Sequence, residues 1–242
     1  MKRNKIKVNG LYKSFDGNSV LNDISFQIET GEFVAVMGQS GCGKSTLLYS
    51  VSGMDRPTKG QIRFDNRELS ALSDKEMQKL RLEHMGFIFQ KPNFIKNLSI
   101  ADNIVFPAFQ LGKKPRKEIV ADAETLMKKM GILSVAGHDI RKVSGGQLQR
   151  AAICRAMINH PDILFGDEPT GALNSSSTKE VMDILEQINF SGTTILLVTH
   201  DAKVAERADR IIYLEDGKIK DEFRKKKSAE ISLKEWLAKM GF

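Results

Sequence analysis

The chain has 242 residues, of which 41% are hydrophobic and 28% are charged, with a formal net charge of +7. This composition is ordinary for a globular protein with a core, and no apolar run approaches the ~20 residues that span a bilayer. The basic N-terminus lacks the apolar segment of a signal peptide, so we expect no export. Cys42 and Cys154 lie in unrelated contexts, which excludes a CxxC or Cys/His metal site and favours a reducing compartment.

Positive charge is concentrated in two runs, GKKPRK at 112–117 and RKKK at 224–227. A basic chain suits nucleic acid, anionic lipid or a nucleotide as partner, but basic runs are also common on ordinary solvated surfaces. Charge alone therefore leaves the partner open.

Short apolar runs bounded by turn signals predict strands at 6–8, 24–28, 33–37, 61–64, 86–89, 162–165, 194–198, 210–214 and 218–220. The early runs alternate and are joined by short turns, DGN at 16–18 and ETGE at 29–32, as in antiparallel strands. Three runs are continuously apolar, which is typical of strands buried on both faces of a parallel sheet: 33–37, 162–165 and 194–198.

Helical patterns fill the gaps, at 44–52, 74–83, 100–111, 115–130, 144–159, 176–189, 201–208 and 231–240. No convincing strand separates the helices between about 90 and 143. This predicts a mostly helical subdomain inserted into an α/β core.

The most specific motif is Gly38-x-x-x-x-Gly43-Lys44-Ser45, which follows the run at 33–37 and opens a helix. It fits the P-loop pattern, in which glycines let backbone N–H groups converge on phosphate oxygens at a helix N-terminus. Lys44 is placed to meet the β- and γ-phosphates, Ser45 to ligate Mg²⁺ and Thr46 to contact the α-phosphate. We expect a nucleotide site formed by Gly38, Ser40, Gly41, Cys42, Gly43, Lys44, Ser45 and Thr46.

A second motif, DILFGDEPT at 162–170, supplies the carboxylates that hydrolysis requires. Asp167, at the carboxyl edge of a buried strand, would reach the Mg²⁺ shell directly or through water. Glu168 is one residue further, where a carboxylate can polarise the attacking water.

A third motif, SGGQ at 144–147, opens an apolar-periodic helix. A Ser-Gly-Gly before a helix N-terminus is a second anion-binding site of the same kind as the first. Because one γ-phosphate does not need both, we expect the second site to serve the nucleotide of another copy in a head-to-tail two-fold dimer. Taken alone, the motif is equally an ordinary capped helix start.

Together these residues resemble the ATP-binding-cassette (ABC) ATPase family along almost the whole chain. The resemblance implies ATP and Mg²⁺ as cofactors and an α/β fold: a P-loop NTPase core with a mostly parallel sheet, an N-terminal antiparallel β subdomain and an inserted α-helical subdomain. It divides one domain, 1–242, into a core at 1–89 and 160–222, a helical part at 90–159, and a basic tail with a helix at 223–242.

The resemblance also assigns roles to further residues. Phe15 stands where the family places an aromatic side chain on adenine, with Tyr12 as a second candidate and a core position as the other interpretation. Gln90 resembles the glutamine that touches Mg²⁺ or the lytic water and couples the helical subdomain to the site. His200 resembles the switch histidine that contacts the γ-phosphate. The signature residues are Ser144, Gly145, Gly146 and Gln147.

Three residues depart from the family pattern: Val143 replaces Leu, Leu148 replaces a polar residue, and Asn174 replaces Asp. The first change we expect to be harmless, and the second slightly alters the surface of the signature helix. The third removes a charge that would face the partner's site, which puts the strength of coupling between the two sites in doubt.

Within the family, DEPTGALN at 167–174 and ADNIVFPAFQLG at 101–112 resemble the macrolide-export and lipoprotein-release branch. The tail at 231–242 and the GALN variant are similar to ATPases of bacitracin- or lantibiotic-type antimicrobial-peptide resistance transporters. The resemblance implies a cytoplasmic subunit, peripheral at the inner face of the cell membrane, that energises a separate permease. The predicted docking surface lies at 91–111 (Phe94, Ile95, Leu98, Ile104, Phe106), with Ile104 and Phe106 the better candidates for the core.

Two other functions stay open. One is an ATPase of a non-transporting membrane complex, of the cell-division or signalling type. The other is an ABC ATPase acting on DNA or ribosomes, which predicts a coiled-coil insertion, zinc-binding cysteines or two cassettes. The chain has none of these, so we expect no direct contact with nucleic acid.

Overall fold

The computed structural model describes residues 3–225 and 232–241. The chain divides into two compact units: Met1–Met77 with Asn189–Phe242, and Gln78–Ile188. Part of the basic run at 224–227 and the first residue of the predicted helix at 231–240 lie outside the described residues. None of the described helices is long and apolar enough to cross a bilayer.

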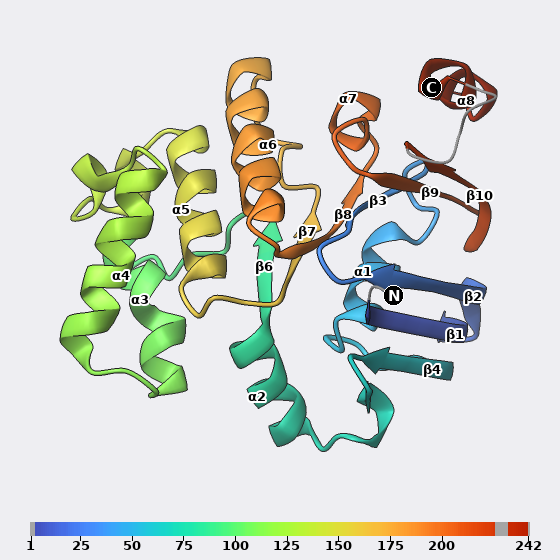
Figure 1. Cartoon of the computed structure of the whole chain (residues 1–242), viewed down its shortest axis with the longest axis horizontal. Helices are drawn as coiled ribbons and strands as arrows, with labels where there is room; N and C mark the ends of the chain where they lie inside the picture. The colour runs from blue at the N-terminus through green and yellow to red at the C-terminus, as the bar shows by residue number, and fades with distance from the viewer. Residues whose placement is uncertain (1–2, 226–231, 242) are drawn as a thin grey trace. The chain divides into compact units, whose positions relative to one another are not determined.

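The first unit contains an antiparallel sheet with strand order β2-β1-β4-β5, of which Figure 1 labels β2, β1 and β4. Its strands are β1 (Asn4–Phe15), β2 (Asn18–Glu29), β4 (Lys59–Phe64) and β5 (Arg67–Glu68). β1 and β2 form a hairpin across Asp16 and Gly17, which both have positive φ, of 47° and 82°. A two-residue turn of this kind matches the twist of the strands, so the predicted antiparallel turn at 16–18 is confirmed.

The parallel strands of the first unit surround β3 (Phe33–Met37). β3 pairs in parallel with β8 (Thr194–Thr199) and with β9 (Arg210–Glu215), and β9 pairs antiparallel with β10 (Lys218–Arg224). The turn at 29–32 therefore carries the chain from one sheet to another, and the prediction that it joins antiparallel neighbours is wrong. Every residue of β3 is buried, and a strand of this kind needs cover on both faces.

The helices of the first unit are short. They are α1 (Lys44–Val51), the 3-10 helix η1 (Leu69–Ala71), α7 (Ala202–Ala205) and α8 (Leu233–Lys239). α7 is shorter than the predicted helix at 201–208, because Asp201 serves as its N-cap and the chain soon enters β9. α2 (Asp74–His84) begins in the first unit and ends in the second.

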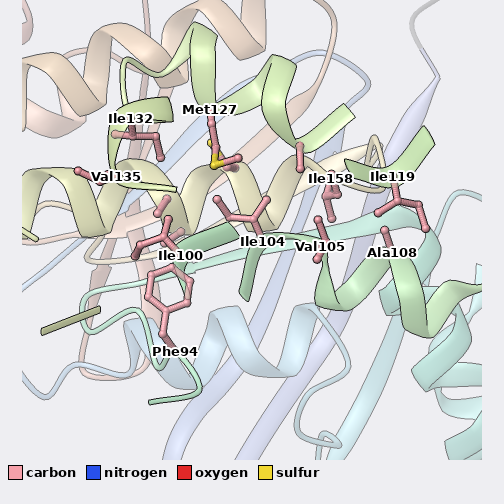
Figure 2. Close-up of a cluster of buried hydrophobic side chains, with 14 residues drawn as sticks. Phe94, Ile100, Ile104, Val105, Ala108, Ile119, Met127, Ile132, Val135 and Ile158 are labelled. Carbon is pink, nitrogen blue, oxygen red and sulfur yellow. The ribbon is translucent and has the colours of Figure 1, made fainter. Parts of the chain in front are cut away.

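The second unit contains the parallel pair β6 (Met85–Phe89) and β7 (Ile163–Asp167). Its helices are α3 (Ile100–Leu111), α4 (Arg116–Lys129), α5 (Gly145–Met157) and most of α6 (Ser175–Phe190), with 3-10 turns η2 (Leu133–Val135) and η3 (Ile140–Lys142). α3, α4 and α5 pack on one another around a cluster of buried apolar side chains (Figures 1 and 2).

This helical core changes the predicted docking surface. Phe94 is only 8% exposed and packs into the cluster, so its prediction as a docking residue is wrong (Figure 2). Phe106, predicted as core, is 40% exposed, whereas Ile104 is buried as expected. α3 turns one face toward α4 and α5, and Phe106 lies outside that face.

Candidate active site

The phosphate loop connects β3 to α1 in the first unit, and two of its glycines are required by close packing. A Cβ on Gly38 would lie 2.2 Å from the carbonyl oxygen of Leu214. A Cβ on Gly43, the N-cap of α1 at φ 103°, would lie 2.9 Å from Leu21 Cδ2. The loop is therefore held tightly against its neighbours, which fixes the direction of its backbone.

Lys44 begins α1 and is only 6% exposed. Its ammonium group donates hydrogen bonds to the carbonyl oxygens of Gly38, at 2.9 Å, and Gln39, at 2.8 Å. A cation held by carbonyl groups at a helix N-terminus is a strong attractor for a phosphate group. Ser45 and Thr46 follow in the first turn of α1 and are half-buried.

A hollow of about 440 Å³ lies beside this loop. Residues of the phosphate loop form one wall of it, and the turn after β9 forms another; the lining includes Gln39, Ser40, Gly41, Cys42, Tyr213 and Glu215. Burial raises the pKa of the Cys42 thiol, and the charge of Lys44 opposes that shift. At neutral pH Cys42 is therefore a protonated, half-buried thiol in the wall of the hollow.

Phe15 ends β1 and is 46% exposed, so the interpretation of Phe15 as a core aromatic is wrong. The ammonium group of Lys13 lies 4.6 Å from the centre of the Phe15 ring. Tyr12 lines a different surface hollow, together with Asn22 and Asp23. The exposed ring is available for stacking, and its contact with adenine stays a prediction.

His200 follows β8 directly and is exposed. In the parallel pairing of β3 with β8, Met37 lies opposite Thr199. Gly38 and His200 therefore leave the sheet at the same carboxyl edge, one at the start of the phosphate loop and one after the neighbouring strand. This is the edge at which parallel α/β sheets bind ligands.

The second unit repeats this arrangement with the other predicted catalytic groups. In the pairing of β6 with β7, Phe89 lies opposite Asp167, so Gln90 and Glu168 leave adjacent strands at the same edge. A Cβ built on Gly171 would lie 2.8 Å from Gln90 Nε2 and 3.2 Å from Glu168 Oε2. The amide of Gln90 and the carboxylate of Glu168 thus converge over Gly171, a residue that sequence reasoning missed.

Glu168 itself has φ 49°, a left-handed conformation that is uncommon for residues other than glycine. Such conformations cost about 1–3 kcal/mol and are concentrated at functional sites. The backbone reverses sharply at this residue, and Gly171 N donates to the Glu168 carbonyl oxygen at 3.0 Å.

The SGGQ motif begins α5 in the second unit, with Ser144 and Gly145 exposed, Gly146 buried and Gln147 half-buried. Ser144 and Gln147 form a capping box: Gln147 N donates to Ser144 Oγ at 3.2 Å, and Ser144 N donates to Gln147 Oε1 at 2.9 Å. A Cβ on Gly146 would lie 2.8 Å from Ser177 Oγ of α6. The motif is thus a well-capped helix start, and its binding of a partner's nucleotide stays a prediction.

The structure shows the local contacts of all three residues that depart from the family pattern. Asn174 caps α6, because its side-chain oxygen accepts a hydrogen bond from Ser177 N at 2.9 Å, as an aspartate would. Leu148 packs against the helical core instead of adding to the exposed surface of α5, and Val143 packs there too.

Each unit carries its own group of the predicted site residues. The first unit holds the phosphate loop, Phe15 and His200, and the second holds Asp167, Glu168, Gln90 and residues 144–147. No cluster of three or more His, Cys, Asp or Glu in the described part of the chain could hold a metal ion. Mg²⁺ at a nucleotide site binds through one or two protein oxygen ligands together with substrate phosphates and water. Ser45 and Asp167 are the residues that would hold it.

Comparison with known proteins points to one family. A family model described as ABC transporter matches residues 21–171. The lipoprotein-releasing system ATP-binding protein LolD of Aquifex aeolicus is 39% identical over 214 residues, which cover 88% of this chain and 95% of that protein. The macrolide export ATP-binding/permease protein MacB of Rhodopseudomonas palustris is 44% identical over 216 residues, 88% of this chain. The chain spans about a third of the length of the MacB proteins, 33% in that case.

Solved structures agree with this result. The dimeric structure of MJ0796, a bacterial ABC transporter cassette, has a TM-score of 0.85 and 37% identity over 90% of this chain and 98% of that one. Another dimeric structure of MJ0796, at 36% identity, shows a post-hydrolysis state bound to ADP and Pi. The predicted fold class is confirmed: α/β, with a mostly parallel sheet, an antiparallel N-terminal sheet and helices.

Proposed function

The chain belongs to the ABC transporter family, and on that basis we propose that it binds and hydrolyses ATP to drive a separate membrane permease. The observation that carries this proposal is the convergence of Gln90 and Glu168 over Gly171, in a chain that also has a complete phosphate loop around buried Lys44. A phosphate loop alone would support binding. A carboxylate beside an amide at a strand end adds the groups that activate and orient water.

Each residue then has one task in hydrolysis. Lys44 and the backbone N–H groups of the loop bind the β- and γ-phosphates, while Ser45 and Asp167 hold Mg²⁺, which neutralises developing charge on the phosphates when bound. Glu168 polarises the attacking water and Gln90 orients it. His200 contacts the γ-phosphate, and Phe15 stacks on adenine.

A second copy of the chain completes the site in this proposal. Ser144 and Gly145 lie exposed at a helix N-terminus, where the N–H groups and the helix dipole favour an anion. The same chain also has its own phosphate loop, so the motif suits a partner's nucleotide in a two-fold, head-to-tail dimer. The dimeric structures of the MJ0796 cassette support this arrangement.

The permease is expected to dock on the exposed apolar side chains of the segment 95–109. Those side chains are Ile95, Phe106 and Phe109, and Arg116 stacks over the Phe109 ring at 5.7 Å. Two lysines of the neighbouring basic run already have partners within the second unit, since Lys113 pairs with Glu83 and Lys114 with Asp122. The apolar side chains are therefore the main candidates, and such docking would keep the chain at the inner face of the membrane.

The cargo we propose is an amphiphilic compound, in the manner of antimicrobial-peptide resistance. The names of the relatives, macrolide export and lipoprotein release, support an export or release role with lipophilic cargo. The narrower assignment rests on the resemblance of the C-terminal helix and of residues 171–174. Deletion of the gene should sensitise its host to such peptides, and an unchanged sensitivity to peptides with a changed sensitivity to macrolides would redirect the assignment.

Glu168→Gln tests the proposed hydrolysis. We expect the ATPase rate to fall about 10²-fold or more, because the general base is lost, while ATP affinity is retained. ATP should then trap the variant as a dimer, measured by size-exclusion chromatography with light scattering. Glu124→Gln, on the exposed side of α4, is the matched control and should keep the normal rate. A Glu168→Gln variant with an undiminished rate would contradict the assigned role.

A further inference from the structure

A hydrogen bond attaches α5 to the backbone just before Gln90. Gln149, a residue of α5 that is only 2% exposed, donates a hydrogen bond from Nε2 to the carbonyl oxygen of Phe89 at 3.1 Å. Phe89 is the last residue of β6 and the immediate neighbour of Gln90. A buried side-chain amide bonded to a backbone carbonyl leaves that peptide little freedom.

Further hydrogen bonds attach α5 to the backbone just after Gln90. The guanidinium group of Arg155 donates to the carbonyl oxygen of Asn93 at 3.2 Å and, through its other terminal nitrogen, to that of Pro92. It also stacks over the Phe94 ring, 4.4 Å from the ring centre. Burial lowers the pKa of Arg155 to about 10, so the group is still charged at neutral pH.

Phe94 anchors the far end of the segment. Its ring points into the cluster shared by α3, α4 and α5, beside Ile100 (Figure 2). Gln90 therefore lies on a short stretch of backbone that is held at both ends. Both ends are hydrogen-bonded to α5, and Phe94 also packs into the core around that helix.

That helix begins with the SGGQ motif. From its N-cap Ser144 to Arg155 is a run of about 16 Å at 1.5 Å per residue. The helix between them is packed through fully buried residues, Ala151, Ala152, Ile153 and Cys154. A displacement of the exposed N-terminus of α5 would thus be transmitted to both attachments of the Gln90 segment.

We propose that Gln149 and Arg155 are positioning residues that link the motif at 144–147 to Gln90. When the partner's nucleotide binds at the N-terminus of α5, the helix sets the position of Gln90 in the chain's own site. Neither side chain contacts the reacting atoms; both act through Gln90. This inference rests on the proposed function, from which it takes the roles of Gln90 and of residues 144–147.

Arg155→Lys tests the link with a small change. Lysine keeps the charge but loses the planar fork that reaches two carbonyl groups and the stacking on Phe94. We expect kcat for ATP hydrolysis to fall about ten- to hundredfold through misplacement of Gln90, with the Kd for ATP changed less than about twofold. Arg116→Lys is the matched control and should keep kcat. The guanidinium group of Arg116, in α4, also stacks on a phenylalanine ring, that of Phe109.

A double-mutant cycle separates positioning from general stability. In a Gln90→Ala background, Arg155→Lys should cause no further loss of kcat, because its effect passes through the absent amide. Hydrogen exchange of the peptide 89–97 should be faster in Arg155→Lys and remain fast when ATP drives dimer formation. The peptides of α3 and α4 should exchange at the rate of the unchanged protein.

Each outcome bears on one of the two proposals. If Gln90→Ala lowers kcat but neither Arg155→Lys nor Gln149→Met does, the link is overturned while the ATPase proposal stands. The link is also overturned if the fold-losses of kcat in Gln90→Ala and Arg155→Lys multiply in the double variant. If Gln90→Ala keeps the full rate while Glu168→Gln does not, the role of Gln90 and the link both fail. Should Arg155→Lys not fold, the same cycle with Gln149→Met decides the question.

Discussion

Gly171 leaves room for two predicted catalytic side chains by having none of its own. The atoms nearest to a built Cβ are Gln90 Nε2, at 2.8 Å, and Glu168 Oε2, at 3.2 Å. Both are the ends of flexible side chains, so a methyl group could be accommodated by moving them. The stability of the fold would then change little while the geometry of the site changes.

Gly171→Ala is therefore expected to separate activity from stability. We expect kcat to fall about tenfold or more, since displacements near 1 Å at a reacting centre are costly, while the unfolding midpoint stays within a few degrees. Steady-state ATPase assays and thermal denaturation measure the two effects. Gly137→Ala is the control, because nothing lies within 4 Å of a Cβ there. A full rate in Gly171→Ala would argue against the assigned roles of Gln90 and Glu168.

The two cysteines differ in reactivity for physical reasons. Burial raises the pKa of the Cys154 thiol to about 12 and also raises that of Cys42, which lies half-buried in the phosphate loop. The thiolate is the reactive form, so both thiols react more slowly at neutral pH than a free cysteine. Cys42 is the accessible one.

Maleimide labelling should modify Cys42 alone in the folded protein. Because the pKa is raised, the labelling rate should still be rising with pH at pH 9 as the thiolate fraction grows. ATP should protect Cys42, and labelling should block ATP binding; mass spectrometry and nucleotide binding measure both. The variant Cys42→Ala should resist the reagent. Labelled Cys42 with intact ATP binding would contradict the predicted contact of this loop with phosphate.

Among the elements, α8 packs through two buried residues, Leu237 and the single tryptophan of the chain, Trp236. The Trp236 ring meets Tyr213 edge-on at 6.5 Å and Phe223 at 5.7 Å, and its Nε1 donates to Asp221 Oδ2 at 3.1 Å. Ser232 and Glu235 form a capping box at the start of the helix. A seven-residue helix is too short to persist alone, so the packing of Trp236 and Leu237 decides whether it forms.

Trp236→Ala should release α8 locally. Loss of a buried aromatic side chain costs about 3–5 kcal/mol, more than a short terminal helix can retain. Hydrogen exchange should become fast over 232–241 while β3 and β8 stay protected. Trp236→Phe, which keeps a ring and loses the N–H, should cost only about 1 kcal/mol. Unchanged protection of α8 in Trp236→Ala would refute this account.

At the scale of the whole molecule, the proposed composite site makes a prediction about mixtures. Lys44→Ala removes the phosphate-binding lysine, and Ser144→Arg blocks the exposed start of α5. Each variant alone should be inactive. A mixed dimer, however, combines both defects in one site and leaves the other site intact.

Mixing the two variants should therefore restore part of the ATPase activity. The recovered activity should rise with total concentration, because it depends on association. Mixing Lys44→Ala with Glu168→Gln is the control, since the proposal assigns both residues to the chain's own nucleotide and predicts that no intact site forms. No recovery with Lys44→Ala and Ser144→Arg would mean that each chain completes its own site.

Local signals in the sequence were sufficient to predict the order of the main helices and strands along the chain. The glycines and Lys44 of the phosphate loop, the apolar strands at 33–37 and 194–198, and the cap residue Ser144 act on their immediate neighbours, so their effect can be read along the chain. The predicted fold class followed from those elements and from the resemblance, and the related structures bear it out.

Features that depend on contacts between residues distant in the sequence could be determined only from the tertiary structure. β1 and β2 extend over Asn4–Phe15 and Asn18–Glu29, far beyond the apolar runs at 6–8 and 24–28, because pairing with a neighbouring strand decides where a strand ends. Phe94 and Phe106 look alike in the sequence, and only the packing of α4 and α5 against α3 decides which is buried. The convergence over Gly171 and the attachment of Gln90 to α5 arise in the same way, from contacts between residues as much as 81 positions apart, Gln90 and Gly171.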